Sequence, residues 1–390
     1  MARKTVVKAH RFRFYPTDEQ AAMLERTFGC VRLVYNKALH ERTQQWYENQ
    51  ISLNYVDTAK LLTQWRNSDE LGFLSEVSVV PLQQSLRHLQ TAFQNFWKKR
   101  AAYPRFKFKK KTSLALEYSK AGFSVKDGNV YIAKSREPLA ITYTRDISLE
   151  DVTTLTVKKD RAGRWFVSLR VKEDVREKPV TGKTVGIDLG VKDAVICDNG
   201  SKYNPSDMYD LSQKQNVIRQ RQKELSRKQK GSKNREKAKL KLARAHARKA
   251  DAHRDWLHKT TTKLMEQYDV ICLEDLNVRG MTRRAYGRGV TAKSGLNRAI
   301  IENSFSEFRR MLEYKADWYG KHVTVIDRFY PSTKRCSYCG FINHEMTLST
   351  RFWTCSKCDT HHDRDINAAT NIKAAGLAVL ACGDSVSLTS

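Results

Sequence analysis

Four cysteines near the end of the chain have the spacing of a metal site. They form two C-x2-C pairs, Cys336 with Cys339 and Cys355 with Cys358, with residues 340–354 between them. Each pair can occupy a tight turn that aims two thiolates at one point, and two such turns complete a tetrahedral set of four sulfur ligands. We therefore expect one structural Zn²⁺ in a zinc ribbon. The alternative is four unrelated buried cysteines, which this spacing disfavours.

Three acidic residues occupy positions where carboxylates are unusual. Asp188 lies inside the apolar segment VGIDLG, Glu274 ends the apolar segment VICLE, and Asp365 opens a predicted helix, DRDINAA. A carboxylate in a central strand is costly to bury unless it is paired or binds a metal. Two acids on neighbouring strands and one on an adjacent helix can converge on two divalent cations, and Mg²⁺ suits ligands that are all oxygen. The chemistry would be two-metal hydrolysis of a phosphodiester.

Each acid also has an ordinary interpretation when it is taken alone. Asp188 could cap a turn, Glu274 could end a strand in solvent, and Asp365 could be a helix N-cap, since single motif matches carry a false-positive risk. Their joint occurrence beside a zinc ribbon favours the catalytic interpretation.

The elements that must position these residues follow from the hydrophobic pattern. Residues 184–200 predict a buried strand, a tight turn and a second strand. The segment YDVICLEDL predicts another strand, and residues 277–298 are expected to form a polar loop. A helix is predicted at about 303–319 with Gly320 as its stop. HVTVID predicts a further strand before the cysteine cluster.

The first half of the chain has a different pattern. Residues 5–16 alternate as a strand, and Thr17 with Gln20 predicts a capping box at the start of a helix. Apolar residues at helical spacing make residues 17–100 a small helical domain. A β-hairpin is predicted around residues 161–163. Residues 101–178 together with the first strand are therefore expected to form a small β-barrel that the helical domain interrupts.

Positive charge dominates the composition. The chain holds 71 Lys and Arg residues against 42 Asp and Glu residues, a net charge of +29. A surplus of this size predicts a polyanionic partner, and nucleic acid is the leading candidate. Residues 211–250 hold 15 basic and two acidic residues in a predicted helical hairpin that turns at KGSKN. A solvated basic hairpin is the alternative for this segment.

Membrane association is not expected from this sequence. No run of about 18 apolar residues is present, and residues 1–16 lack the apolar core of a signal peptide. Four scattered cysteines, Cys30, Cys197, Cys272 and Cys382, indicate free thiols in a reducing compartment rather than a disulfide framework. These features predict a cytoplasmic protein.

The motifs, in their order, resemble the TnpB family of IS200/IS605-type transposons, which is similar to miniature type V CRISPR nucleases. The resemblance rests on GIDLGVKD, LEDL, YPSTKRCSYCG and WTCSKCDTHHDRDINAATNI, with FYPTDEQ, LSEVSVVPLQQSL and EYKADWYG also in order. It runs from about residue 5 to residue 375.

The resemblance implies a multidomain α/β architecture. It implies a wedge-type β-barrel that carries an inserted helical recognition domain, and an RNase H-like RuvC nuclease domain with an inserted zinc ribbon that binds the target nucleic acid. The corresponding boundaries are 1–16 and 101–180 for the barrel, 17–100 for the helical domain, 181–332 and 361–378 for the nuclease domain, 333–360 for the zinc ribbon, and 379–390 for a disordered tail.

The resemblance also implies an activity. It implies an RNA-guided DNA endonuclease that cleaves both strands of guide-matched DNA beside a short flanking motif, with a guide RNA derived from the transposon end. Its RuvC acids correspond to Asp188, Glu274 and Asp365, with two catalytic Mg²⁺ ions there and one Zn²⁺ at the cysteines. Asp365 is preferred to Asp363 because the family's acid immediately precedes the x-Asn-Ala-Ala start of the helix. A monomer is the favoured oligomeric state.

Candidate nucleic-acid contacts are a further expectation. Phosphate contacts are expected along residues 211–250 and in the segment YPRFKFKKK, where Phe106 and Phe108 are expected to pack into the core. By resemblance, Tyr55 and Gln83 would face the DNA beside the target, although Gln83 is equally a surface amide. The full candidate set is Tyr55, Gln83, Arg105, Lys107, Lys109, Arg221, Lys228, Lys230, Lys233 and Arg235.

Three other functions compete with this one. An RNA-guided DNA-binding or regulatory protein would more plausibly have lost one of the three acids. A transposase, or an accessory factor of transposition, would more plausibly show a His-hydrophobe-His motif, and the adjacent His361 and His362 do not fit it. A zinc-ribbon scaffold without chemistry would leave a buried Asp188 unexplained.

Overall fold

The computed structural model describes residues 3–110, 113–284, 289–347 and 349–383. The chain divides into two compact units, an N-terminal unit of Thr5–Glu173 and a C-terminal unit of Asp174–Ser390 with Met1–Lys4. Each unit has its own hydrophobic core and is described by itself.

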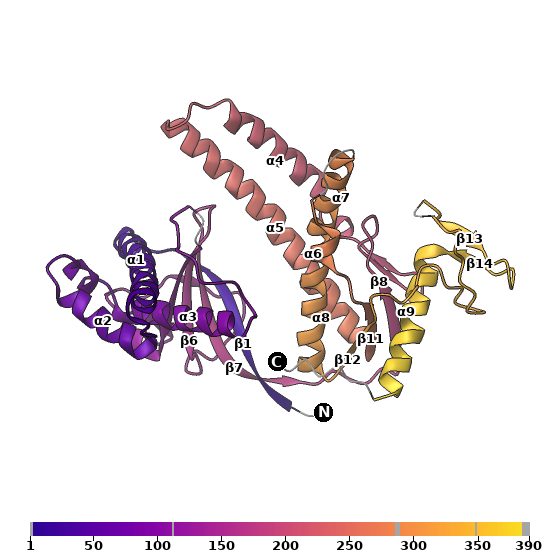
Figure 1. Cartoon of the computed structure of the whole chain (residues 1–390), viewed down its shortest axis with the longest axis horizontal. Helices are drawn as coiled ribbons and strands as arrows, with labels where there is room; N and C mark the ends of the chain where they lie inside the picture. Colours follow the sequence, from indigo (N-terminus) through magenta and orange to yellow (C-terminus); the bar gives the residue numbers. More distant parts are fainter. Residues whose placement is uncertain (1–2, 111–112, 285–288, 348, 384–390) are drawn as a thin grey trace. The chain divides into compact units, whose positions relative to one another are not determined.

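A five-stranded sheet forms the centre of the N-terminal unit, in the order β2-β6-β7-β1-β5 (Figure 1). Its strands are β1 (Arg3–Phe14), β2 (Leu114–Ser119), β5 (Ile141–Thr142), β6 (Thr154–Lys159) and β7 (Trp165–Arg176). The predicted hairpin is confirmed, since β6 and β7 pair antiparallel with Val157 opposite Val167. The side chain of Asp160 closes its turn by accepting hydrogen bonds from the backbone of Ala162 and Arg164.

The helices α1 (Asp18–Asn49), α2 (Tyr55–Asn67) and α3 (Val79–Trp97) lie between β1 and β2 in the chain. The predicted capping box of Thr17 and Gln20 is present at the start of α1. Leu24 and Phe28 of α1 pack into the core of the sheet with Phe12 and Phe14 of β1. The three helices also share a second core of their own.

The strands of this unit do not close into a barrel through hydrogen bonds. Among the described residues, β2 and β5 are the two edges of the sheet, and the hairpin of β3 (Phe123–Lys126) and β4 (Asn129–Ile132) forms a separate two-stranded sheet. The hairpin packs Val130 and Ile132 into the core of the larger sheet. Alternating strands predict a buried face correctly, but closure depends on long-range pairing that the pattern does not encode.

A second five-stranded sheet forms the centre of the C-terminal unit, in the order β10-β9-β8-β11-β12. Its strands are β8 (Thr184–Asp188), β9 (Val195–Cys197), β10 (Lys202–Tyr203), β11 (Val270–Glu274) and β12 (His322–Ile326). The pairs of β8 with β11 and of β11 with β12 are parallel, whereas β8 with β9 and β9 with β10 are antiparallel.

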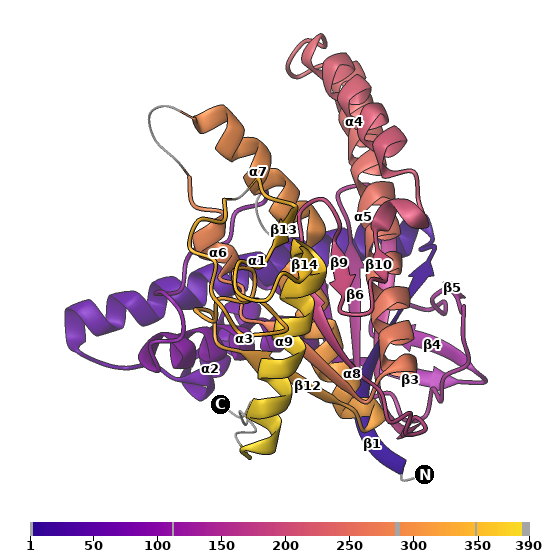
Figure 2. The same ribbon diagram turned by 90° about the vertical axis from the view of Figure 1, so that its right-hand side faces the viewer.

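Helices cover both faces of this sheet. Figure 1 shows α9 (Arg364–Ala381) on one side of β8 and β11, with α5 (Lys233–Gln267) and α8 (Phe305–Tyr319) on the other, and Figure 2 shows α9 crossing in front of the strands. Val185 and Ile187 of β8 pack with Trp256 of α5 and Phe308 of α8. On the opposite face, Cys272 of β11 packs with Ile326 of β12 and Ile372 of α9.

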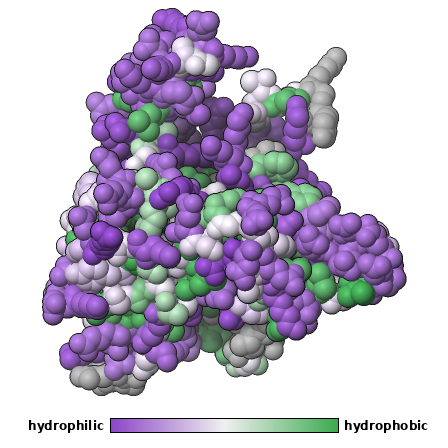
Figure 3. All heavy atoms as spheres, turned by 90° about the vertical axis from the view of Figure 1, so that its left-hand side faces the viewer, coloured by the Kyte–Doolittle hydropathy of each residue, from purple (hydrophilic) through white to green (hydrophobic). Residues whose placement is uncertain are grey.

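The basic segment forms the predicted helical hairpin. The helices α4 (Leu211–Ser226) and α5 pack side by side along their length. In Figure 3 the hairpin rises at the top left, and its visible surface is almost entirely hydrophilic.

Two expectations for the C-terminal unit were wrong. The segment expected as a polar loop, residues 277–298, contains α6 (Val278–Met281) and the start of α7 (Val290–Asn303). Helix α7 has no side-chain N-cap, and tertiary hydrogen bonds from Lys293 and Asn297 to backbone carbonyls of residues 281–283 hold it. The expected disordered tail begins too early, because α9 continues to Ala381, while residues 384–390 lie outside the described residues.

Short elements complete the structure. Strands β13 (Phe352–Thr354) and β14 (His361–Asp363) pair in the cysteine-rich segment. Its sheet therefore extends past residue 360, up to the start of α9. The 3-10 turns are η1 (Gly72–Ser75), η2 (Lys120–Gly122) and η3 (Pro205–Asp207). Within the described ranges, every helix is too short or too polar to cross a lipid bilayer.

Candidate functional site

Asp188 and Glu274 end two neighbouring parallel strands. The register that pairs Leu273 of β11 with Ile187 of β8 brings Glu274 beside Asp188 at the next position. Adjacent strands are about 4.8 Å apart, and side chains two positions apart share a face. Because Ile187 faces α5 and α8, both carboxylates lie on the face that α9 covers.

Helix α9 carries Asp365 to this corner of the sheet. Asp363 is the N-cap of α9, and its side chain accepts hydrogen bonds from the backbone of Asp365 and Ile366 at 2.9 and 3.1 Å. Asp363 is therefore committed to the backbone, while Asp365 is close enough to Asp188 to affect its ionisation. This geometry favours Asp365 over Asp363 as the third acid.

Glycine makes the close packing of α9 on the sheet possible. A Cβ atom on Gly186 of β8 would lie 2.0 Å from the backbone oxygen of Ala369. A Cβ atom on Gly376 of α9 would lie 2.5 Å from Sγ of Cys272 on β11. Both distances are far inside van der Waals contact, so the position of α9, and with it that of Asp365, depends on these two glycines.

The carboxyl groups of Asp188, Glu274 and Asp365 place several negative charges close together where β8 and β11 end. Burial, followed by the charges of Asp365 and Glu274, raises the pKa of Asp188 to about 7. Burial and the adjacent Asp275 raise the pKa of Glu274. Among the described residues, neither Asp188 nor Glu274 forms an ion pair. The charge of Arg364 offsets part of this effect at Asp188. Two carboxylates on one face without an ion pair of their own fit the binding of divalent cations.

Asp365 is held differently. Its carboxylate pairs with Arg351 at 3.2 Å and with Arg364 at 2.8 Å. Within the described part of the chain, the four cysteines alone form a group of three or more His, Cys, Asp or Glu residues with all ligand atoms within 4.8 Å of one another. The structure thus brings the three acids to one corner, but their oxygen atoms do not form a closed ligand shell.

The four cysteines do form a closed cluster. Cys336 lies 3.7 Å from Cys358 and Cys339 lies 3.6 Å from Cys355, measured between sulfur atoms. Both C-x2-C turns have the same backbone shape, because the residue after the second cysteine adopts a positive φ. This residue is Gly340 (φ 78°) in the first turn and Asp359 (φ 56°) in the second. Four sulfur ligands in one cluster fit a Zn²⁺ ion.

His362 contacts this cluster, a feature that the spacing of the motif did not predict. Its Nε2 lies 3.0 Å from Sγ of Cys336, and its ring packs on Trp353 with a centroid distance of 4.8 Å. The side chain is buried, and it immediately precedes the N-cap of α9. The sequence carried no signal for this contact, which depends on the pairing of His362 in β14 with Trp353 in β13.

The residues expected to face the flanking DNA lie on one surface of the N-terminal unit. Tyr55 begins α2, and the guanidinium of Arg87 on α3 stacks over its ring at 4.6 Å. Gln83 is exposed on α3, one turn before Arg87. Arg87 is thus a further basic candidate that sequence reasoning did not select.

The expectation for the segment YPRFKFKKK was wrong in part. Phe106 and Phe108 are 48% and 61% exposed rather than packed in the core. Backbone hydrogen bonds of Lys107 to the side chain of Asn36 set the orientation of the segment and turn Lys107 inward, where its Nζ lies 3.7 Å from the ring centroid of Tyr35. Burial lowers the pKa of Lys107 to about 8.

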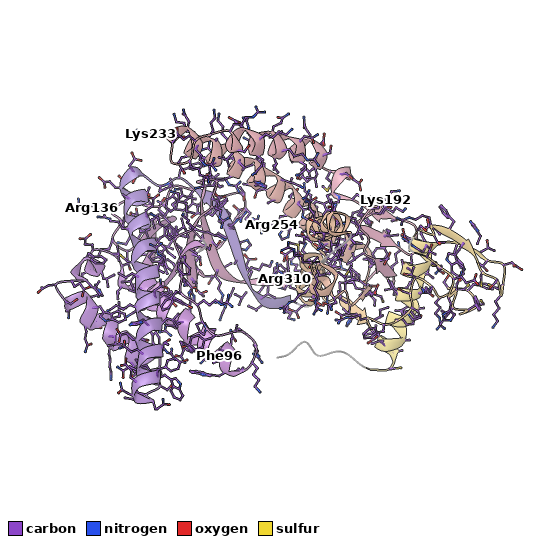
Figure 4. The ribbon with its side chains drawn as sticks, turned by 45° about the horizontal axis from the view of Figure 1, so that its top comes forward. Phe96, Arg136, Lys192, Lys233, Arg254 and Arg310 are labelled. Atoms are coloured by element: carbon purple, nitrogen blue, oxygen red, sulfur yellow. The ribbon has the colours of Figure 1, made fainter. Side chains whose placement is uncertain are left out.

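The remaining candidates divide between exposed and engaged side chains. Arg105, Lys109, Lys228, Lys230 and Lys233 are exposed. Figure 4 shows Lys233 at the tip of the α4–α5 hairpin.

Two arginines of the hairpin already have partners within it. Arg221 pairs with Glu224 at 2.8 Å. Arg235 donates to the backbone oxygens of Leu225 and Lys228 at the end of α4, so its guanidinium stabilises the turn of the hairpin.

Three carboxylates at the ends of parallel strands and the start of a helix, in a chain that also has a four-cysteine cluster, fit the class of metal-dependent enzymes. Sequence models of protein families match three segments: "Cas12f1-like, TNB domain" at residues 305–372, "Probable transposase" at 166–285 and "Helix-turn-helix domain" at 1–50. Over the last of these segments the structure contains β1 and one uninterrupted helix, α1.

Curated relatives cover almost the whole chain. A putative RNA-guided DNA endonuclease of Streptomyces pristinaespiralis is 48% identical over 98% of this chain and 92% of its own length. The putative RNA-guided DNA endonuclease InsQ of Escherichia coli K12 is 34% identical over 97% of this chain and 95% of its own length. The chain belongs to the TnpB family.

A solved structure shares the fold. The Cas12f1 chain of a Cas12f1–sgRNA–target DNA complex aligns with a TM-score of 0.57 at 15% identity, covering 95% of this chain and 99% of that one. At this identity the likeness concerns the fold alone.

Proposed function

We propose that this protein is an RNA-guided DNA endonuclease that hydrolyses guide-matched double-stranded DNA at a single RuvC-type site. The observation that carries the proposal is the convergence of Asp188, Glu274 and Asp365 on one corner of the sheet, with the pKa of Asp188 raised to about 7. The family relatives that span almost the whole chain are named for the same activity.

The three acids would hold two Mg²⁺ ions, which supply an activated water and stabilise the leaving 3′ oxygen. Asp188 and Glu274 provide carboxylates that form no ion pair among the described residues, although the charge of Arg364 acts on Asp188. Asp365 would serve as a third metal ligand, and Arg351 and Arg364, which pair with it, would be placed to contact the phosphate of the substrate.

The finer architecture belongs to the same proposal. The sheet of β8–β12 with α5, α8 and α9 acts as an RNase H-like nuclease domain, and the cysteine-rich segment is an inserted zinc ribbon with one structural Zn²⁺. The β-sheet of the N-terminal unit acts as the wedge domain, and α1–α3 act as the recognition domain for the DNA flanking the target.

A guide RNA from the transposon end explains the charge. The net charge of +29 requires a polyanion, and the exposed lysines of the α4–α5 hairpin suit contacts to phosphates without reading sequence. We propose that a monomer carries one guide RNA.

The test is to express the protein with its native flanking transposon DNA and to sequence the RNA that remains bound at high salt. A discrete RNA that ends in a variable segment, and Mg²⁺-dependent cleavage of a plasmid matched to that segment, are expected. Asp188→Asn is the matched control. Guided binding without cleavage by the unmodified protein would instead show a DNA-binding regulator, and random cellular RNA would overturn the RNA-guided function.

A further inference from the structure

A groove of about 900 Å³ lies in the C-terminal unit between the helical hairpin and the helices that follow β11. Residues of α4, α5, α7 and the start of α8 line it. Its volume is in the range of sites that hold small organic ligands, about 300–1,000 Å³. It is separate from the smaller cavity of about 280 Å³ that touches Glu274.

The charged residues of this groove favour an anion. Lys249, Arg254 and Arg298 line it against two carboxylates, Glu302 and Glu307. Both carboxylates already have partners: Glu302 pairs with Lys249 at 3.0 Å, and Glu307 forms two hydrogen bonds with the guanidinium of Arg310.

The guanidinium groups of Arg254 and Arg298 therefore remain in excess of the carboxylates. Arg310 and Arg254 both lower the pKa of Glu307, so two arginines share one carboxylate, and Figure 4 shows them next to each other. Arg298 forms no ion pair with any described residue. Guanidinium groups in this state bind phosphate oxygens in pairs of parallel hydrogen bonds.

A buried polar atom without a partner lies in the wall of the groove. Nε2 of His253 is buried and has no hydrogen-bond partner among the described residues. Burial, followed by the charge of Lys249, lowers the pKa of His253, so its ring is neutral at neutral pH. A neutral imidazole can donate to or accept from the edge of a nucleobase.

An apolar wall completes the groove. Leu211, Leu257 and Ile301 line it, and Ile301 is 62% exposed, an unusual position for a large aliphatic side chain. Apolar side chains give the face of an unpaired base a surface to pack against, while arginines hold its phosphate. Contacts for a phosphate and for a base face are thus both present within one groove, with a neutral imidazole in its wall.

The groove is connected to the strand that carries Asp188. Asn303 lines the groove at the end of α7, and its side chain donates to the backbone oxygens of Gly190 and Val191 at 2.9 and 3.1 Å. These two residues follow Asp188 closely in the chain. A ligand that contacts α7 therefore touches an element bonded to the loop beside the catalytic carboxylate.

We propose that this groove binds a single-stranded segment of nucleic acid, with its phosphates at Arg254 and Arg298 and one base against Ile301 beside His253. The inference rests on the proposed function and deepens it, because it assigns a binding site for an unpaired strand next to the nuclease site. The segment belongs either to unpaired guide RNA or to a DNA strand, since both present the same phosphate and base chemistry.

Photo-crosslinking tests the groove directly. A benzophenone amino acid replaces Ile301, and the same replacement at Val180, which is 87% exposed outside the groove, is the control. The guide-RNA-bound protein is irradiated with and without guide-matched DNA. We expect a crosslink from position 301 and none from position 180. Sensitivity to ribonuclease without DNA identifies RNA as the source, and a nuclease-sensitive crosslink that appears only with DNA identifies a DNA strand.

A second measurement does not depend on the probe. The second measurement is the affinity for nucleic acid as a function of salt concentration. We expect the double variant Arg254→Gln/Arg298→Gln to reduce the magnitude of the slope of log affinity against log salt concentration by about 1.4, since each single-stranded phosphate contact contributes about 0.7. The exposed pair Arg145→Gln/Arg161→Gln is the matched control. An intact, cleaving complex with no crosslink from position 301 and an unchanged slope would overturn the groove alone. Absence of any guide RNA would overturn the proposed function instead.

Discussion

Asp188 has a pKa raised to about 7 because it is buried close to two other carboxyl groups. In the unfolded chain the group ionises near the ordinary aspartate pKa of 3.8. The folded protein therefore binds the proton more tightly, and ionisation of Asp188 costs folding free energy that increases from about pH 4 and is complete above about pH 7. Two cations that neutralise this corner would remove that cost.

Asp188→Asn tests both consequences. Cleavage is expected to fall at least about a thousandfold, equivalent to roughly 4 kcal/mol of transition-state stabilisation, because a metal ligand is lost. In magnesium-free buffer above pH 7, urea unfolding is expected to show a gain of up to about 4 kcal/mol, because a buried charge is removed. The exposed Asp151→Asn variant should change neither. Cleavage at the normal rate would remove Asp188 from the site.

The pH dependence of magnesium activation follows from the same group. Metal binding requires the ionised carboxylate, so protons compete with Mg²⁺ below the pKa of about 7. The magnesium concentration for half-maximal cleavage is expected to fall about tenfold per pH unit below pH 7 and to level off above it. Guide-RNA binding is measured over the same range as the control. A magnesium requirement that is constant with pH would contradict the raised pKa.

His362 provides a prediction for the zinc centre. In the tautomer that carries its proton on Nε2, His362 donates to the Cys336 sulfur and would stabilise thiolate ligation, and loss of such a partner weakens metal affinity by about 10–100-fold. His362→Phe keeps the packing on Trp353 and removes the donor, so zinc transfer to a colorimetric chelator is expected to accelerate by that factor. The adjacent exposed His361→Ala is the control. Equal transfer from all three proteins would show that His362 only fills space.

The packing of α9 on β8 is the contact between elements that positions the site. A Cβ atom at position 186 would lie 2.0 Å from the backbone oxygen of Ala369, which leaves no room for a side chain. Helix α9 therefore lies directly on the strand that ends in Asp188. A shift of α9 moves Asp365 away from the other two acids. The four-cysteine segment precedes α9 through β14, so only a short stretch of chain joins the cysteine cluster to Asp365.

Gly186→Ala tests this contact. The added methyl group forces strand and helix apart, and we expect a loss of about 3 kcal/mol or more in unfolding free energy, together with a loss of cleavage. Gly295→Ala on α7 is the control, because no atom lies within 4 Å of the position that its methyl group would occupy and alanine favours helix. A Gly186→Ala protein of normal stability would show that α9 can shift without cost.

The distribution of charge is a property of the whole molecule. A net charge of +29 favours association with a polyanionic partner, and the α4–α5 hairpin carries a concentrated share of that charge. Two arginines of the hairpin are less available for that purpose, since Arg221 and Arg235 have partners within it. The exposed lysines at its tip are the better candidates for contacts with the guide RNA.

The triple variant Lys228→Ala/Lys230→Ala/Lys233→Ala tests the hairpin. Each lost phosphate contact lowers the salt slope of RNA affinity by about 0.7, so the three together are expected to lower it by about 2. Three exposed lysines of the N-terminal unit, Lys60, Lys98 and Lys126, serve as the matched control when changed to alanine. The same loss in both variants would show that total charge, rather than the hairpin, controls binding.

Local patterns determined much of this protein from sequence alone. Three features depend on residues close together in the chain: the capping box of Thr17, the hairpin at Asp160 and the cysteine spacing. They can therefore be predicted without knowledge of the tertiary structure. The position of Asp188 in an apolar segment could be identified for the same reason. The family followed from the order of such motifs.

Tertiary structure decided what depends on distant partners. Lys107 is turned inward by Asn36, which lies far from it in sequence, and α7 is held by hydrogen bonds to an earlier segment instead of by a cap. The choice of Asp365 over Asp363 gained support only when the N-cap role of Asp363 was seen. Sequence spacing specifies which groups can react or cap locally, whereas packing and strand register decide which of them meet.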